Sequence, residues 1–404
     1  NTKFLCQQVG EMIRTLNPTL AIRQTIGYFG VMIAIGFYIA CLGPTLPNLA
    51  SNTGSSLEQI SILFSARAFG YLLGSLTIGQ LYDRVAGHRM LALIMILAGG
   101  MMALVPVLST LWILALVLLV LGIGEGGVDV GSNTLLVWVH GEKVGPFMNA
   151  LHFFFGLGAF LSPVIIAQTV LLSGDIKLGY WLLAIYALPV AAWFLRTPAP
   201  AGAQSKPDQH NPVLNVGLLV WIAVFFFLYV SAEASFGGWI FTYATAAGLG
   251  DANSAAYLTS IFWAAFTAGR LLGIPLATRL KPSAMILSDL LGCLVGMSIL
   301  IIWSESVPAL WIGSVLVGIS MASLFPTMLV LAERRMQLKG RVTRWFFVGA
   351  GLGGMFLPWM IGQFFVSWGP QVTLYFILAD LVLVLGVSVL ILRYPKLNSL
   401  ASPA

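Results

Sequence analysis

The sequence predicts an all-α integral membrane protein with twelve transmembrane helices, arranged as two six-helix repeats. Three observations carry this prediction: a composition suited to lipid, twelve long apolar stretches, and glycine motifs that recur at a nearly constant spacing. Of the 404 residues, 59% are hydrophobic and only 8% are charged, whereas soluble domains carry roughly 25% charged residues. The chain therefore presents most of its surface to lipid and leaves no room for a sizeable soluble domain.

Each apolar stretch is long enough to cross roughly 30 Å of hydrocarbon. The stretches span residues 22–47, 58–81, 89–109, 111–139, 146–172, 178–196, 213–247, 253–278, 283–303, 308–332, 343–367 and 371–393. A polar, proline-rich segment separates the first six from the last six. We therefore expect an N-terminal six-helix bundle at 1–196, a cytoplasmic linker at 197–212 and a C-terminal six-helix bundle at 213–404.

The basic residues predict the orientation, because Lys and Arg concentrate in the cytoplasmic loops of membrane proteins. If the N-terminus is inside, all twenty Lys and Arg fall on the inner side except Lys177, which lies outside, and Arg67 and Arg270, which lie within spans. We expect both termini in the cytoplasm, at a bacterial inner membrane or a plasma membrane. The formal charge of +6 is then a topology signal, and no nucleic-acid partner is expected.

Glycine motifs in the two halves match in the same order. The matches are Gly70-YLLG with Gly269-RLLG at an offset of 199, LGIG from Leu121 with VGIS from Val317 at 196, and Gly156-LGAFLSP with Gly351-LGGMFLP at 195. Three matches at nearly one offset indicate a duplicated six-helix unit. Parallel repeats of this kind favour alternating access around a site at the midplane, between the halves.

Two acids and an amide lie inside the 111–139 span. Glu125, Asp129 and Asn133 are spaced i, i+4 and i+8, so they share one helical face. Charged groups at this depth usually face a polar path and carry function. Two carboxylates one turn apart cannot both ionise cheaply, so we expect the pair to couple transport to H⁺ or Na⁺, with no other cofactor. The alternative is a structural pair bonded to backbone or to Arg67.

Polar side chains in neighbouring spans are candidate substrate contacts. Asn133 can donate to and accept from a sugar hydroxyl, or it can join two helices. In the 146–172 span, His152 and Asn149 lie three residues apart, and His152 suits a substrate contact or a proton relay. The alternative for His152 is a packing residue among phenylalanines.

The 213–247 span combines an acid with aromatic residues. Glu233 is followed by Trp239 and Tyr243. A carboxylate can bond to sugar hydroxyls while an aromatic ring covers the C–H face of the sugar. Aromatic residues facing lipid are the simpler alternative. Gln363, in the 343–367 span, is a further candidate on the assumption that it points inward.

Two arginines lie near repeat-equivalent positions. Arg67 and Arg270 could neutralise membrane acids, bind an anionic substrate, or extend their charges to the membrane surface. Asp289 and Asp380 lie in the 283–303 and 371–393 spans. We expect a structural pairing for Asp289 and assign no role to Asp380.

The loop after the second span reads Gly79-Gln-Leu-Tyr-Asp83-Arg84-Val-Ala-Gly87-His88-Arg89. With these residues the chain resembles the major facilitator superfamily over essentially its whole length. The loop is similar to the cytoplasmic signature of that family, with one extra residue between Arg84 and Gly87. The resemblance implies a conformational switch formed by Gly79, Asp83, Arg84 and Arg89, in which Asp83 caps a helix or pairs with an arginine across the halves. An ordinary solvated turn is the alternative.

Three longer segments carry a narrower resemblance. Asn133-TLLVWVHG, Leu151-HFFFGLGAFLSP and Tyr229-VSAEASFGGWIFTY resemble the branch that holds fucose permease and the sodium-dependent glucose transporter relatives. The resemblance implies that membrane acids couple sugar uptake to protons or sodium. Fucose-permease-like proteins also carry an acid in their first span, and the 22–47 span has none, so coupling should rest on the 111–139 or 213–247 span.

We therefore expect a monomeric secondary transporter, in contact with lipid, that carries a small molecule, most simply a neutral sugar in symport with a cation. The alternative is a proton-antiport exporter of amphipathic compounds or lipids. A third alternative is a membrane enzyme or a receptor-like protein without transport. The enzyme is disfavoured, because the chain has no HExxH, Gly-x-Ser-x-Gly or phosphate-loop motif and its three cysteines have no metal-ligand spacing. A polar lining at Asn133, His152, Glu233 and Gln363 would favour the sugar, and an aliphatic lining the exporter.

Overall fold

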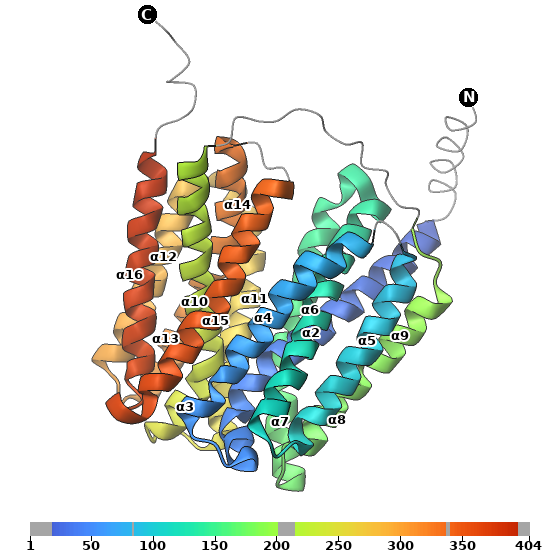
Figure 1. The fold of residues 1–404 in the computed structure, drawn as a ribbon. Coiled ribbons are helices and arrows are strands. Elements are labelled where there is room, and N and C mark those ends of the chain that lie inside the picture. The colour runs from blue at the N-terminus through green and yellow to red at the C-terminus, as the bar shows by residue number, and fades with distance from the viewer. Residues whose placement is uncertain (1–17, 83–84, 201–214, 337–339, 395–404) are drawn as a thin grey trace, which may run out of the picture.

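Long helices dominate the computed structural model, which describes residues 18–82, 85–200, 215–336 and 340–394. They run side by side between two ends of the molecule (Figure 1). In chain order the α-helices are α2 (Pro18–Thr53), α3 (Leu57–Ile60), α4 (Ile62–Thr77), α5 (Gly87–Leu104), α6 (Leu111–His140), α7 (Gly145–Ser173), α8 (Lys177–Ile185), α9 (Ala187–Arg196), α10 (Val216–Ala246), α11 (Ala252–Arg279), α12 (Pro282–Ile302), α13 (Val307–Met321), α14 (Leu324–Arg335), α15 (Gly340–Trp368) and α16 (Val372–Arg393).

Twelve helical segments of the described chain are long and apolar enough to cross a membrane, as predicted. The first is longer than the predicted 22–47 and runs over Thr19–Thr53, because the helix continues through Pro44 and Pro47. The sixth span is divided into α8 and α9 at Tyr186, and the tenth into α13 and α14 at Ala322 and Ser323. The protein is a multi-pass membrane protein.

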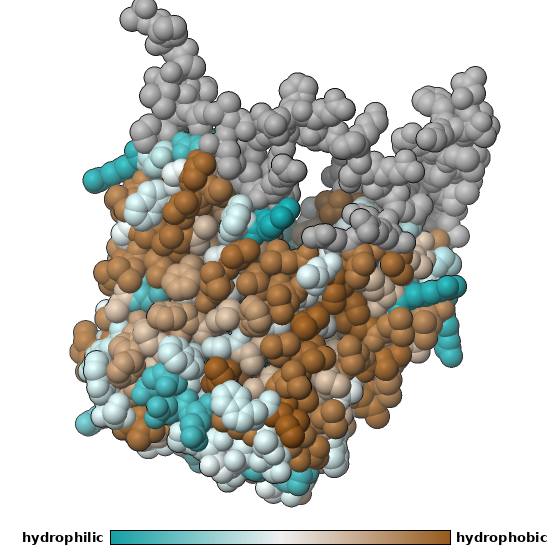
Figure 2. Space-filling view, in the orientation of Figure 1, coloured by the Kyte–Doolittle hydropathy of each residue, from teal (hydrophilic) through white to brown (hydrophobic). Residues whose placement is uncertain are grey.

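The outer surface fits this conclusion. Figure 2 shows a face that is hydrophobic across its middle, with hydrophilic residues gathered towards the two ends. Large apolar side chains such as Leu93, Leu116 and Leu291 point outward, with more than half of their area exposed. In water this exposure would be unfavourable, whereas in a bilayer these side chains contact lipid tails.

The two ends of the molecule differ in what they carry. We call the end at which α2 begins and α16 ends the terminal end, and the opposite end, where α3 lies, the far end (Figure 1). At the far end, side chains cap the N-termini of helices that run back towards the terminal end. For example, the Asp251 side chain accepts a hydrogen bond from the backbone N–H of Ser254 at the start of α11.

Helix pairs in the two halves touch through equivalent glycines, which confirms the predicted repeat. A Cβ at Gly70 or Gly122 would collide with the backbone of the partner helix in the α4–α6 pair, and Gly269 and Gly318 play the same part between α11 and α13. Likewise Gly158 brings α7 against α2, and Gly353 brings α15 against α10. Small residues permit such close approach in membranes, where packing replaces the hydrophobic effect between helices.

The halves are joined by hydrogen bonds at the far end. Gln363 of α15 donates to the backbone oxygen of Glu58 at 3.0 Å and to the Ser61 hydroxyl at 3.1 Å. Slightly deeper, the Ser65 hydroxyl of α4 donates to the backbone oxygen of Met355 at 2.8 Å. On the other side of the bundle, Gln168 of α7 donates to the Tyr257 hydroxyl of α11. The structure therefore has its halves closed together at the far end.

Candidate functional site

Four glycines of α4 and α6 bring two polar side-chain pairs into register. Cβ atoms at Gly122 and Gly126 of α6 would collide with the backbone oxygens of Arg67 and Tyr71 on α4. Cβ atoms at Gly70 and Gly74 of α4 would likewise collide with the backbone of α6. The helices run parallel, so residues at a constant offset of 58 meet: Arg67 meets Glu125, and Tyr71, one turn later, meets Asp129. The glycine spacing thus positions the site.

The first pair is a buried, bidentate ion pair. Nε of Arg67 lies 3.0 Å and its Nη2 2.9 Å from Oε2 of Glu125, and the same two nitrogens lie 3.2 and 3.0 Å from Oε1. The side chains are 12% and 1% exposed. A guanidinium and a carboxylate in this planar arrangement satisfy each other's charge and geometry. Both oxygens of the Glu125 carboxylate are therefore engaged by Arg67, which balances its charge.

In the second pair, the acid accepts its hydrogen bonds from uncharged groups. Asp129 accepts hydrogen bonds from the Tyr71 hydroxyl and, at 2.9 Å, from the Asn133 side-chain amide. The same amide also donates to the backbone oxygen of Asp129 at 2.9 Å. Asp129 and Asn133 are half-buried, unlike Glu125. The two acids of α6, predicted to act together, thus lie in different environments.

Arg270 of α11 faces this acid from the other half. It interacts electrostatically with Asp129 of α6 and with Glu233 of α10. Its guanidinium lies over the rings of Phe266, at 4.7 Å, and Phe155 of α7, at 5.9 Å. Its buried Nε has no hydrogen-bond partner among the described residues. Cation–π contacts hold the guanidinium in place without neutralising its charge, so Arg270 can serve as the counter-charge of Asp129 or of Glu233.

Two further predicted residues join this centre. Glu233 is half-buried in the middle of α10 and interacts with the Tyr229 hydroxyl. His152 of α7 is half-buried and interacts electrostatically with Arg270. Asn149, one turn before His152, is exposed near the start of α7 and lies towards the terminal end. The structure therefore groups His152 and Glu233 with Asp129 around Arg270.

Three other predicted substrate contacts lie towards the far end. Trp239 is fully buried, stacks on Phe365 with ring centroids 5.1 Å apart, and donates to the backbone oxygen of Pro358 at 2.9 Å. Tyr243, one turn further along α10, is also buried. Gln363 bonds across the halves, as described above. Trp239, with its ring centroid 5.9 Å from that of Phe64 on α4, and Gln363 therefore belong to the far-end closure, whereas Tyr243 interacts with Tyr375 of α16.

The profile of the Major Facilitator Superfamily matches residues 26–358. The chain belongs to this family. It is 32% identical over 354 residues to the sodium-dependent glucose transporter 1 of Xenopus laevis, covering 80% of this chain and 72% of the relative. Over 372 residues it is 30% identical to the sodium-dependent glucose transporter 1A of Mus musculus, covering 83% and 88%. A solved mutant of the nucleoside transporter NupG shares the fold, with a TM-score of 0.76, 12% identity and coverage of 93% and 100%.

The predicted switch of this major facilitator protein is described only in part. Asp83 and Arg84 lie outside the described residues. Gly79 lies in the 3₁₀ turn Ile78–Leu81, where a Cβ would crowd Val130 of α6, and Arg89 is exposed at the start of α5. Beside them, the buried Tyr82 ring packs directly on Gly131 of α6. The switching role of the loop stays a prediction.

The remaining membrane acids of this transporter lie away from the centre. Asp289 of α12 accepts a hydrogen bond from Ser323, at the break between α13 and α14, which fits the expected structural pairing. Asp380 of α16 is buried, and one of its oxygens has no partner among the described residues.

Tyr71 and the two phenylalanine rings beneath the Arg270 guanidinium were not predicted from the sequence. Tyr71 follows Arg67 by one turn, as Asp129 follows Glu125, and that matching spacing could have paired them. Phe266 lies one turn before Arg270 on α11, so it was also detectable. Phe155 was not, because its approach from α7 depends on the packing of the two halves.

Proposed function

We propose that this transporter couples the movement of a neutral sugar to one cation, H⁺ or Na⁺, by alternating access. One observation carries the proposal: half-buried charged and polar groups from both halves meet in the middle of the membrane-spanning helices. Asp129 and Asn133 come from the first half, and Glu233 and Arg270 from the second. A site shared by two halves is the geometry that a rocking transporter requires.

Counting charges in this centre supports a single coupling cation. Arg67 and Glu125 neutralise each other. Asp129 and Glu233, if both ionised, leave one negative charge after Arg270 is counted, with His152 neutral. A charge without compensation is costly within a membrane. One bound cation would make the centre neutral, which favours a stoichiometry of one cation per cycle.

Asp129 is the proposed cation carrier, and Glu125 takes a supporting role. The carboxylate of Asp129 is half-buried and bonded only to neutral groups, so it remains available for a proton or a sodium ion. To bind a proton or a sodium ion, Glu125 would have to break its bidentate contact with Arg67. We assign Glu125 and Arg67 to fixing α4 against α6 and thereby positioning Tyr71 beside Asp129.

The lining favours a sugar over an amphipathic compound. Asn133, Glu233 and His152 supply donors and acceptors that match hydroxyl groups. The two glucose-transporting relatives, at 32% and 30% identity, support the same substrate class. An exporter of lipids would need a wider aliphatic surface than these polar side chains and the two phenylalanine rings provide.

The positions of the basic side chains support an inward-facing state. The described Lys and Arg near helix ends gather at the terminal end, for example Arg23, Arg196 and Arg279, whereas Lys177 lies at the far end. By the positive-inside rule the terminal end is then cytoplasmic. Since the halves are closed at the far end, the central acids would be reached from the cytoplasm in this conformation.

The test is solute-driven ion movement in proteoliposomes. A panel of hexoses and deoxyhexoses is added outside, and internal pH and ²²Na⁺ uptake are followed together. The proposal expects one sugar class to move one of the two ions. Sugar uptake that moves neither ion would refute the coupling, and the absence of sugar uptake across the panel would refute the substrate class.

A further inference from the structure

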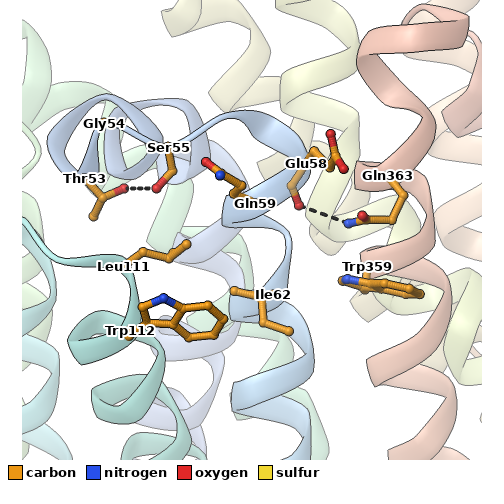
Figure 3. A pocket seen from close by; sticks show the side chains of 10 residues that line it. All are labelled: Thr53, Gly54, Ser55, Glu58, Gln59, Ile62, Leu111, Trp112, Trp359 and Gln363. Atoms are coloured by element: carbon orange, nitrogen blue, oxygen red, sulfur yellow. Dashed lines mark hydrogen bonds between the residues drawn. The ribbon is translucent and has the colours of Figure 1, made fainter.

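A pocket of about 440 Å³ opens at the far end, on the surface between the two halves (Figure 3). Its first wall is α3 with the starts of α4 and α6, and its second wall is α15. Figure 3 shows Trp112 and Ile62 on the first wall and Trp359 with Gln363 on the second. We call this the outer pocket. It is separated from the Asp129 centre by the closure that includes Trp239.

The chemistry of the outer pocket suits an uncharged polyol. Two indole rings, Trp112 and Trp359, offer faces for sugar C–H groups. The Gln363 side chain offers its oxygen and the Gln59 side chain its N–H groups, because the Gln59 oxygen accepts from the Ser56 backbone N–H. Glu58 is the one charged residue among the described residues of the lining. Because that charge is negative, phosphate and carboxylate ligands are disfavoured. Tryptophans at a membrane surface often serve only as anchors, but here they line one pocket together with two glutamines and a glutamate.

The outer pocket shares residues with the closure of the far end. Gln363 lines the pocket and also donates to the backbone oxygen of Glu58, the contact drawn as a dashed line in Figure 3. The Ser61 hydroxyl accepts from Gln363 and lies 3.4 Å from the backbone oxygen of Trp359. A hydroxyl group that engages the Gln363 amide would compete with these bonds and weaken the contact between α4 and α15.

We propose that the outer pocket is a second sugar-binding site, at which a sugar docks while the far end is still closed. Its occupation releases Gln363 and so favours opening of the far end. The choice of a sugar as the ligand rests on the proposed function. The position, the uncharged ligand class and the coupling to the closure rest on the pocket itself.

The test uses protein locked closed at the far end. Gln168→Cys and Tyr257→Cys, on the opposite side of the bundle from the pocket, are joined by a short bismaleimide. D-glucose is added outside the reconstituted protein, and saturation-transfer NMR detects its binding. The proposal expects a signal from locked protein that falls at least severalfold in Trp359→Ala and Gln363→Ala. Trp303→Ala, an exposed tryptophan at the same end outside the pocket, is the matched control and should keep it.

Separate outcomes judge the pocket and the proposed function. A signal that persists in Asn133→Ala, which removes a proposed sugar contact of the central site, identifies the outer pocket as distinct from that site. No signal from locked protein, or a signal unchanged by both pocket variants, overturns the second site. If no sugar of the panel is transported but the locked protein binds glucose through Trp359, the proposed function fails while the pocket stands.

Discussion

Replacing Glu125 by Gln should destabilise the protein strongly, because it leaves the Arg67 charge buried without a partner. The two side chains are 12% and 1% exposed, so water cannot replace the lost carboxylate. Removing one partner of such a pair costs about 3–5 kcal/mol, which is roughly two to four powers of ten in the unfolding equilibrium at about 1.4 kcal/mol per decade. The double variant Arg67→Met with Glu125→Met should recover most of this loss.

The chain supplies both the reporter and the control for this experiment. Cys41 of α2 and Cys293 of α12 are buried free thiols, one in each half. In a Cys6→Ser background, their reaction with a fluorogenic maleimide reports unfolding during heating or denaturant titration. Asp175 and Lys177 form a salt bridge of 2.8 Å with both side chains at least 40% exposed. Asp175→Asn should cost only about 0–1 kcal/mol.

If Glu125→Gln is as stable as Asp175→Asn, leaving Arg67 without its partner does not lower the free energy of unfolding, and the expected cost is refuted. The double variant adds a second criterion. If Glu125 only supports the site, the double variant should still accumulate sugar uphill. A stable double variant that exchanges sugar but cannot accumulate it would return the coupling role to Glu125.

Three further predictions concern coupling and closure. Asp129→Asn should abolish uphill accumulation while sugar counterflow persists; accumulation at the level of the unmodified protein would remove Asp129 from the coupling role. Arg270→Gln leaves Asp129 and Glu233 without their shared counter-charge, and an uncompensated charge is costly within a membrane. Net transport should therefore slow more than exchange; equal losses in both assays would contradict this. Gly362→Ala would drive a Cβ into Ser61 and should favour an open far end, seen as faster labelling from outside of Thr242→Cys, a buried position towards the far end of α10. Unchanged labelling would show that the α4–α15 contact does not control the closure.

Most of the fold followed from the sequence, because lipid imposes simple rules on composition, length and basic residues. The repeat was visible as well, since the same glycines that recur in the sequence make the backbone contacts between helices. The site was harder to predict. The spacing of Glu125 and Asp129 placed both acids on one face. Their different partners depend on the register of α4 against α6, which pairs Arg67 with Glu125 and Tyr71 with Asp129.

The three far-end residues illustrate a limit of a different kind. Trp239, Tyr243 and Gln363 suit sugar recognition by residue type, but the structure buries Tyr243 and has Trp239 and Gln363 in the contact between the halves at the far end. A sequence does not state which conformation a transporter adopts, and residues along one helix contact different partners in each. Whether Trp239 contacts a sugar in the alternative state stays a prediction.

The central claim, one cation bound at Asp129 for each sugar, is tested most directly by measuring charge and sugar together. Current from proteoliposomes on a solid-supported membrane is integrated and divided by the radiolabelled sugar taken up under the same conditions. The account predicts one positive charge per sugar for the unmodified protein and none for Asp129→Asn. A ratio of zero in the unmodified protein, or a ratio of one that survives in Asp129→Asn, would contradict it.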